Sequence, residues 1–76
     1  TGGAPLLSET VRINRGEGDI AGPLGDLAAK FPEISIGSYP FHHEGVYGAN
    51  IVLRGVDAEQ LKRATTALTQ TFPEDT

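Results

Sequence analysis

Ile34-Ser35-Ile36-Gly37-Ser38-Tyr39-Pro40-Phe41 is the stretch around which the other elements of the chain are arranged. Apolar and small residues alternate in its first half, so Ile34 and Ile36 fall on one face, as in a half-buried strand. A helical pattern ending at Phe31-Pro32 precedes the stretch, and a polar turn that leads to a second strand follows it. The stretch therefore predicts a domain that combines helices and strands.

The composition indicates one small domain. The chain has 76 residues and no cysteine, and its ten acidic and six basic residues give a net charge of −4. Nucleic-acid affinity comes mostly from Lys and Arg on phosphates, so this balance argues against a nucleic-acid partner. No apolar run is long enough to span a membrane. Because the start, Thr1–Pro5, has neither an initiator Met nor a signal-peptide pattern, we expect a piece of a longer, cytoplasmic protein.

The first half of the chain predicts a strand and then a helix. Glu9–Asn14 alternates, with Val11 and Ile13 directed inward, and Arg15–Gly18 is expected to be a turn. An apolar stripe follows at helical spacing, made of Ile20, Leu24, Leu27, Ala28 and Phe31.

The start of this helix stays open at the level of sequence. A proline fits best at the first helical position, so either Gly22 caps a helix that begins at Pro23, or a looser turn from Asp19 leads into it. Pro32 ends the helix, because the residue before a proline avoids the α region.

The second half predicts a strand and a capped helix. Phe41–Gly48 is expected to be a polar and aromatic connection, and Asn50–Arg54 the central strand, with Ile51 and Leu53 in the core. Asp57 is expected to cap the last helix, with Gln60 at the capping-box position. Val56 and Leu61 match a hydrophobic staple. The buried stripe of this helix is Leu61, Ala64, Thr65, Leu68 and Phe72, and Pro73 is expected to end it.

This order, β-α-β-β-α, predicts an α+β fold. A right-handed crossover with the third strand returning antiparallel between the other two gives the strand order 1-3-2, with both helices on one face. The pattern is ferredoxin-like without the fourth strand, or KH-like. We expect a flexible linker over residues 1–7, one domain over 8–73 and a frayed tail over 74–76.

Two short motifs were considered as functional sites. His42-His43-Glu44 clusters potential metal ligands, but neighbours on extended backbone point to opposite sides, so a solvated connection is the favoured interpretation. Gly22-Pro23-Leu24-Gly25 matches the GXXG loop by which KH domains clamp a nucleic-acid backbone. It offers no cation to a phosphate, and a helix start with proline is favoured. No catalytic, cofactor or metal-binding residues are predicted.

Tyr39, Pro40 and Phe41 lie just past a strand end and have two interpretations. They form either a lid on the core or, together with His42 and His43, a contact surface for another domain, because exposed apolar patches usually mark partners.

Three segments carry a family resemblance over Leu7–Phe72. Phe31-Pro32, Ile36-Gly37-Ser38-Tyr39-Pro40 and Val52-Leu53-Arg54-Gly55-Val56-Asp57 resemble the small α+β, KH-like segment that follows a MoaB/Mog-like molybdopterin-binding domain. Proteins of this kind include the CinA family and the bifunctional eukaryotic FAD synthases.

The resemblance implies an accessory role without catalysis. The pterin- or nucleotide-related site and any hydrolase activity would lie in the neighbouring MoaB/Mog-like domain of the same chain, and no cofactor site is carried over to this segment. Its implied role is to pack against, dimerise or orient that domain. The expected partners therefore include a second copy of the full protein, in a homo-oligomer. The alternative is a KH-like RNA-binding module that uses Gly22 and Gly25.

Overall fold

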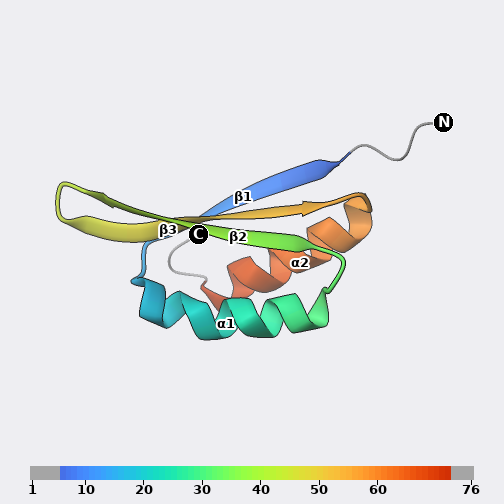
Figure 1. The fold of residues 1–76 in the computed structure, drawn as a ribbon, viewed down its shortest axis with the longest axis horizontal. Helices are drawn as coiled ribbons and strands as arrows, with labels where there is room; N and C mark the ends of the chain where they lie inside the picture. Colours follow the sequence, from blue (N-terminus) through green and yellow to red (C-terminus); the bar gives the residue numbers. More distant parts are fainter. Residues whose placement is uncertain (1–5, 73–76) are drawn as a thin grey trace.

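A computed structural model describes residues 6–72 of the chain, without the side chain of Glu17. Its elements follow the predicted order: β1 (Leu7–Ile13), α1 (Glu17–Lys30), β2 (Ser35–His43), β3 (Val46–Gly55) and α2 (Ala58–Thr71). The α+β class is therefore confirmed (Figure 1).

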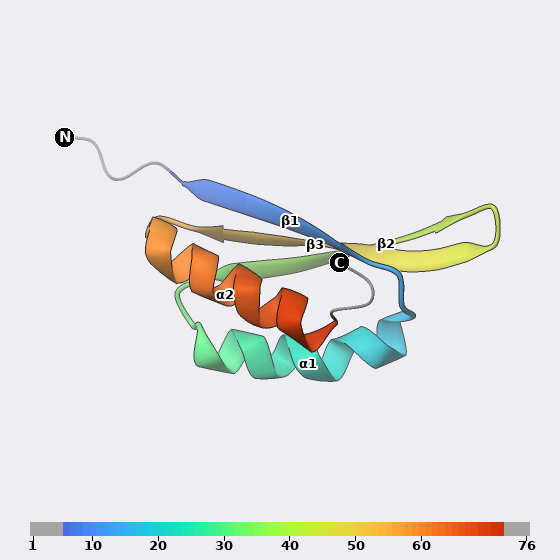
Figure 2. The ribbon, with the colours of Figure 1, turned by 180° about the vertical axis from the view of Figure 1, so that it is seen from behind.

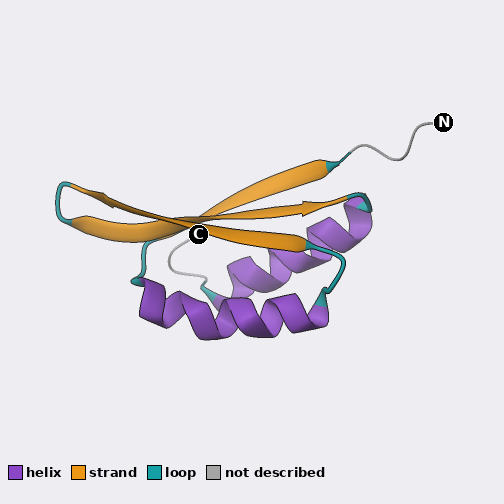
Figure 3. Ribbon diagram, in the orientation of Figure 1, coloured by secondary structure: helices purple, strands orange, loops and turns teal. Residues whose placement is uncertain are grey.

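The strands form one antiparallel sheet in the order β1-β3-β2, as predicted. β1 pairs with β3 from Leu7↔Gly55 to Ile13↔Ala49. β2 pairs with the other side of β3 from Ser35↔Arg54 to His43↔Val46. Both helices lie against the same face of the sheet, which leaves the opposite face uncovered by helices (Figures 1, 2 and 3).

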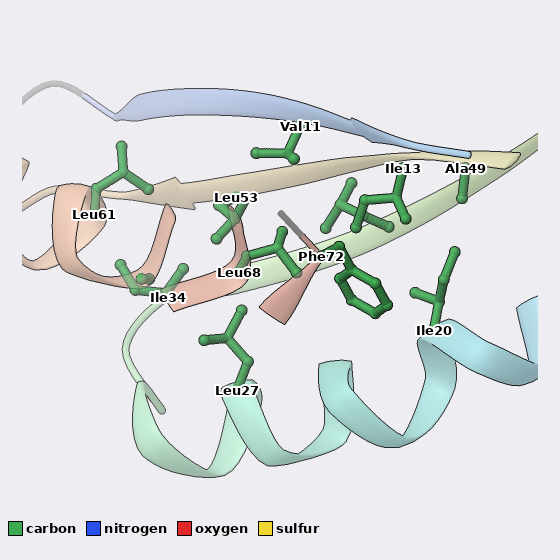
Figure 4. Close-up of a cluster of buried hydrophobic side chains, with 12 residues drawn as sticks. Val11, Ile13, Ile20, Leu27, Ile34, Ala49, Leu53, Leu61, Leu68 and Phe72 are labelled. Atoms are coloured by element: carbon green, nitrogen blue, oxygen red, sulfur yellow. The ribbon is translucent and has the colours of Figure 1, made fainter. Parts of the chain in front are cut away.

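The core fills the space between the sheet and the two helices (Figure 4). Alternate side chains of a strand point to one face, so β1 contributes Val11 and Ile13 while β3 contributes Ile51 and Leu53, all as predicted. The other buried apolar residues are Ile20, Leu27, Ile34, Ala49, Leu61, Ala64, Leu68 and Phe72. Each large side chain in this set contributes roughly 1.5–3 kcal/mol by leaving water.

Helix α1 begins earlier than either sequence interpretation allowed. It starts at Glu17 with Gly16 at the N-cap, so Pro23 is inside the helix, and the turn predicted over Arg15–Gly18 is wrong in its second half. An interior proline costs about 3 kcal/mol, because it removes a hydrogen bond and crowds the preceding turn. The extra turn buries Ile20, which is only 1% exposed, and this burial offsets part of the cost.

The buried stripe of α1 contains fewer residues than predicted. Ile20 and Leu27 are buried, and Leu24 and Phe31 are partly buried against the core. Ala28 is exposed, so its assignment to the buried stripe was wrong.

Helix α2 agrees closely with its prediction. The carboxylate of Asp57 accepts hydrogen bonds from the backbone N–H groups of Glu59 (3.0 Å) and Gln60 (3.2 Å), so the N-cap is confirmed. Its inner face buries Leu61, Ala64 and Leu68, as expected. Val56 is 60% exposed, which argues against the predicted hydrophobic staple.

The predicted ends of the domain fall largely outside residues 6–72. The linker over 1–7, the frayed tail over 74–76 and the stop at Pro73 therefore stay predictions, except that Leu7 is already paired in β1. Helix α2 ends at Thr71, one residue before Phe72.

Candidate contact surface on the hairpin arm

The outer part of the β2–β3 hairpin extends beyond the helices. We call residues 39–48 the hairpin arm; its tip projects past the N-terminal end of α1 (Figures 1 and 2). The connection predicted over Phe41–Gly48 is therefore wrong, because these residues continue the two paired strands.

A two-residue turn closes the arm. Glu44 and Gly45 have φ values of 50° and 82°, and positive φ at both central residues is what a type I′ hairpin turn requires. This turn matches the twist of the flanking strands and keeps them paired up to His43 and Val46.

A stacked pair lies on one side of the arm. His42 and Tyr47 are directly opposite in the strand register, and their rings lie parallel, with centroids 4.3 Å apart and planes inclined by 7°. Both residues remain exposed, and Tyr47 is 63% accessible. The pair therefore presents an ordered aromatic surface to its surroundings.

Phe41 lies on the other side and has a structural role. Its ring covers Gly48, where an added Cβ would come within 2.6 Å of the ring and 2.5 Å of the Ile13 carbonyl oxygen. The guanidinium carbon of Arg12 lies 4.6 Å from the centroid of the Phe41 ring, as in a cation–π contact. Phe41 is thus half-buried by contacts within the sheet.

Tyr39 lies close to Gly37 on the same side of β2, and its ring would touch a Cβ placed there, at 3.2 Å. It is nevertheless 54% exposed. Pro40 is exposed as well; it lies in β2, an edge strand, where a missing N–H is tolerated.

The five residues predicted as a contact surface therefore have different environments. Tyr39, Pro40, His42 and His43 are exposed, whereas Phe41 is half-buried. Sequence reasoning missed Val46, which is 45% exposed, and Tyr47, because both were assigned to a connection. Tyr39, His43 and Val46 lie on the same face of the hairpin as Phe41, whereas His42 and Tyr47 lie on the opposite face. We define the arm surface as these five residues, Tyr39, His42, His43, Val46 and Tyr47, on both faces of the hairpin.

The imidazole of His43 approaches the carboxylate of Glu44 at 3.9 Å, and both side chains are at least 80% exposed. An exposed pair of this kind contributes little, because water screens it. Within residues 6–72, no three His, Cys, Asp or Glu side chains come together where they could hold a metal ion.

The residues of the predicted nucleic-acid loop are helical. Gly22 and Gly25 lie in the middle of α1, with Pro23 between them. A GXXG clamp needs a loop whose backbone can approach phosphates, so the loop predicted here is wrong. The alternative interpretation, a helix that starts at Pro23, is also wrong, because α1 begins six residues earlier, at Glu17.

The fold is that of a small α+β domain whose hairpin arm carries exposed aromatic residues. Neither helix within residues 6–72 has the length and apolar character needed to cross a bilayer. A family model described as "FAD synthase, middle domain" matches residues 5–76, and the chain belongs to this family. No curated protein and no solved structure matches the chain. The resemblance to CinA proteins has no counterpart in these comparisons and stays a prediction.

Proposed function

We propose that this chain is an accessory domain of a cytoplasmic, multidomain FAD synthase and that it docks through the hairpin arm. The partner is a neighbouring MoaB/Mog-like domain of the same protein, which the docked domain orients. Catalysis and ligand binding belong to the other domains. The membership in a family of middle domains supports this position between other parts of a larger protein.

One observation supports the proposal most directly: the stacked pair of His42 and Tyr47 is exposed and lies outside the core. The ring of Tyr47 is stacked on His42 and remains 63% exposed. The tip of the β2–β3 hairpin extends past the end of α1 (Figure 1). Aromatic residues with an apolar body and a polar tip are enriched at protein interfaces. Because the stacked pair is already ordered, it loses less conformational entropy on docking than two free side chains would.

The chemistry of the arm surface indicates the kind of surface that it fits. Val46 and Tyr39 offer apolar contact, while Tyr47 and the two histidines offer hydrogen-bonding groups. A complementary surface is a groove that receives the arm and contacts both of its faces, with an apolar interior and polar groups at its rim, the usual anatomy of a specific interface.

The test compares two exposed apolar residues in the full-length protein by hydrogen exchange. Tyr47→Ser removes one ring of the stacked pair, whereas Val56→Ser changes a residue of similar exposure (60% against 63%) outside the arm. We expect Tyr47→Ser to speed exchange about tenfold both in the arm and in the docked part of the neighbouring domain, since undocking exposes both. Val56→Ser should leave these rates unchanged. Arm amides that exchange equally fast in the intact protein and in the Tyr47→Ser variant would overturn the proposal.

A further inference from the structure

β1 is an edge strand with a groove beside it. Its partner β3 lies on one side only, so the backbone groups on its other side have no strand to pair with in the sheet of residues 6–72. Between β1 and α2 runs a groove of about 490 Å³. Leu7, Ala58 and Leu61 supply its apolar lining, and Glu9 and Lys62 also line it. Free strand edges are templates for another strand.

The chain contains a structural repeat that indicates what occupies this edge. Both helices have 14 residues, and Leu-x-x-x-Phe-Pro-Glu occurs at their ends, at residues 27–33 and again at 68–74. Equivalent residues are 41 positions apart: the N-caps Gly16 and Asp57, the buried pairs Ile20 and Leu61, Leu27 and Leu68, and the C-caps Phe31 and Phe72.

The two helix ends also share one geometry. Phe31 has φ −125° and ψ 68°, and Phe72 has φ −126° and ψ 62°. Each donates its backbone N–H to the leucine carbonyl four residues earlier. The first of these ends directs the chain into β2, which begins at Ser35. The second copy of the motif therefore predicts a strand in the chain that continues from Thr76.

The path of the chain through β1, α1 and β2 indicates where a strand after α2 would lie. After α1 the chain returns as β2, parallel to β1, with β3 between them. The same crossover after α2 returns the chain parallel to β3, with β1 between them, which is the free edge. Helix α2 ends at the required place: the guanidinium carbon of Arg15, just past β1, lies 5.9 Å from the centroid of the Phe72 ring.

We propose that the segment that continues past Thr76 in the full-length protein pairs antiparallel with β1 as a fourth strand. This inference rests on the proposed function only in that the domain lies within a longer chain. The sheet then has four strands, with β1 in its interior. Alternate apolar side chains of the new strand pack on Leu7 and Leu61 in the groove.

A second copy of the chain fits this edge less well. Two β1 strands can pair antiparallel with Thr10 of one opposite Thr10 of the other, which keeps the core-facing residues on one face. In this register, Glu9 of each strand lies opposite Val11 of the other strand. Each Glu9 carboxylate would then lie against an apolar side chain, whereas a different strand can present a matching partner.

The test is hydrogen exchange in the full-length protein, followed at the β1 amides that point away from β3. In one variant, about ten residues after Thr76 are replaced by a Gly/Ser linker, which is longer than an average strand of about 5–6 residues. In the matched control, an equally long segment further along the chain is replaced. We expect the first replacement to speed exchange at these amides at least about tenfold, and the control to leave it unchanged.

Any of three results would overturn the inference, and the first two concern the β1 amides alone. The first is fast exchange of these amides in the intact protein, and the second is equal protection with the linker in place. The third is protection that rises with protein concentration, which identifies a second copy on the edge. Tyr47→Ser acts on the arm and should not alter β1 protection, so this result is independent of whether the arm docks.

Discussion

At the scale of single residues, the fold depends on a few positions at which most substitutions would be destabilising. Gly48 accommodates both the Phe41 ring and the Ile13 carbonyl at the base of the arm. Asp57 satisfies two N–H groups that have no acceptor within α2. The roles of Gly48 and Asp57 both follow from local geometry, but only the cap has a recognisable sequence signal. Asp57 is followed three residues later by Gln60 and then by the apolar Leu61, a pattern typical of a helix start.

Asp57→Ala should destabilise the domain by about 0.5–2 kcal/mol, because it removes the cap and a favourable charge at the helix N-terminus. Asp57→Asn keeps an oxygen acceptor and should lose much less. His43→Ala should change stability little, since His43 is exposed on the arm. The midpoints of urea denaturation at unchanged slope measure all three. A larger loss for His43→Ala than for Asp57→Ala would contradict this account.

Gly48→Ala should destabilise by about 1–3 kcal/mol, because the new methyl group meets the rigid Ile13 carbonyl as well as the Phe41 ring. Gly37→Ala is the matched control. The three atoms nearest to its methyl group all belong to the exposed Tyr39 side chain, at 3.2 Å and beyond, and that ring can move away. Thermal unfolding of the two variants should therefore differ clearly, and equal losses would argue against the close approach at Gly48.

At the scale of elements, the structure differs from the sequence-based prediction in two main places, the start of α1 and the hairpin arm. Sequence patterns located α2, most of β1 and the second half of β3, because their apolar residues repeat with one period. The start of β3 at Val46 was missed, because residues 46–48 were assigned to a connection. The start of α1 was missed because Pro23 is a strong local signal, whereas the burial of Ile20 depends on the rest of the fold. The arm was missed because His42-His43-Glu44 is polar and Glu-Gly is a weaker turn signal than Asn-Gly.

Pro23→Ala should stabilise α1, by up to about 3 kcal/mol, because it restores a helical hydrogen bond and relieves crowding. Gly22→Ala serves as the control. It meets nothing within 4 Å and should add only about 0.5–1 kcal/mol through helix propensity. Urea denaturation compares the two. A loss of stability in Pro23→Ala would show that the proline is needed where it lies.

Glu44→Asn should stabilise the hairpin, because Glu44 adopts a φ of 50°, which Asn tolerates better. The expected gain is about 0.5–1 kcal/mol, within the roughly 1–2 kcal/mol that a left-handed residue costs. A rise in the melting temperature with unchanged amide shifts outside the arm would support this. Glu44→Val is the opposite control and should destabilise, since a β-branched residue suits positive φ poorly.

At the scale of the whole molecule, the fold was predictable and the contact surface only in part. The strand order followed from the element order and the handedness of crossovers, without any knowledge of individual contacts. The surface required the register, since the register alone sets His42 against Tyr47 and Phe41 against Gly48. Within residues 6–72, the sheet thus carries an exposed aromatic hairpin arm at one end and an edge strand, β1, with no strand paired on its outer side.

The central claim is that the arm touches a neighbouring domain, and site-specific photo-crosslinking in the full-length protein tests it most directly. A photoreactive residue replaces Tyr47 in one sample and Val56 in the other, two positions of similar exposure. Mass spectrometry then maps the crosslinked peptides. We expect crosslinks from position 47 to gather on one patch of the proposed partner, a MoaB/Mog-like domain, with none there from position 56. Crosslinks from position 47 that scatter as widely as those from position 56 would contradict the account.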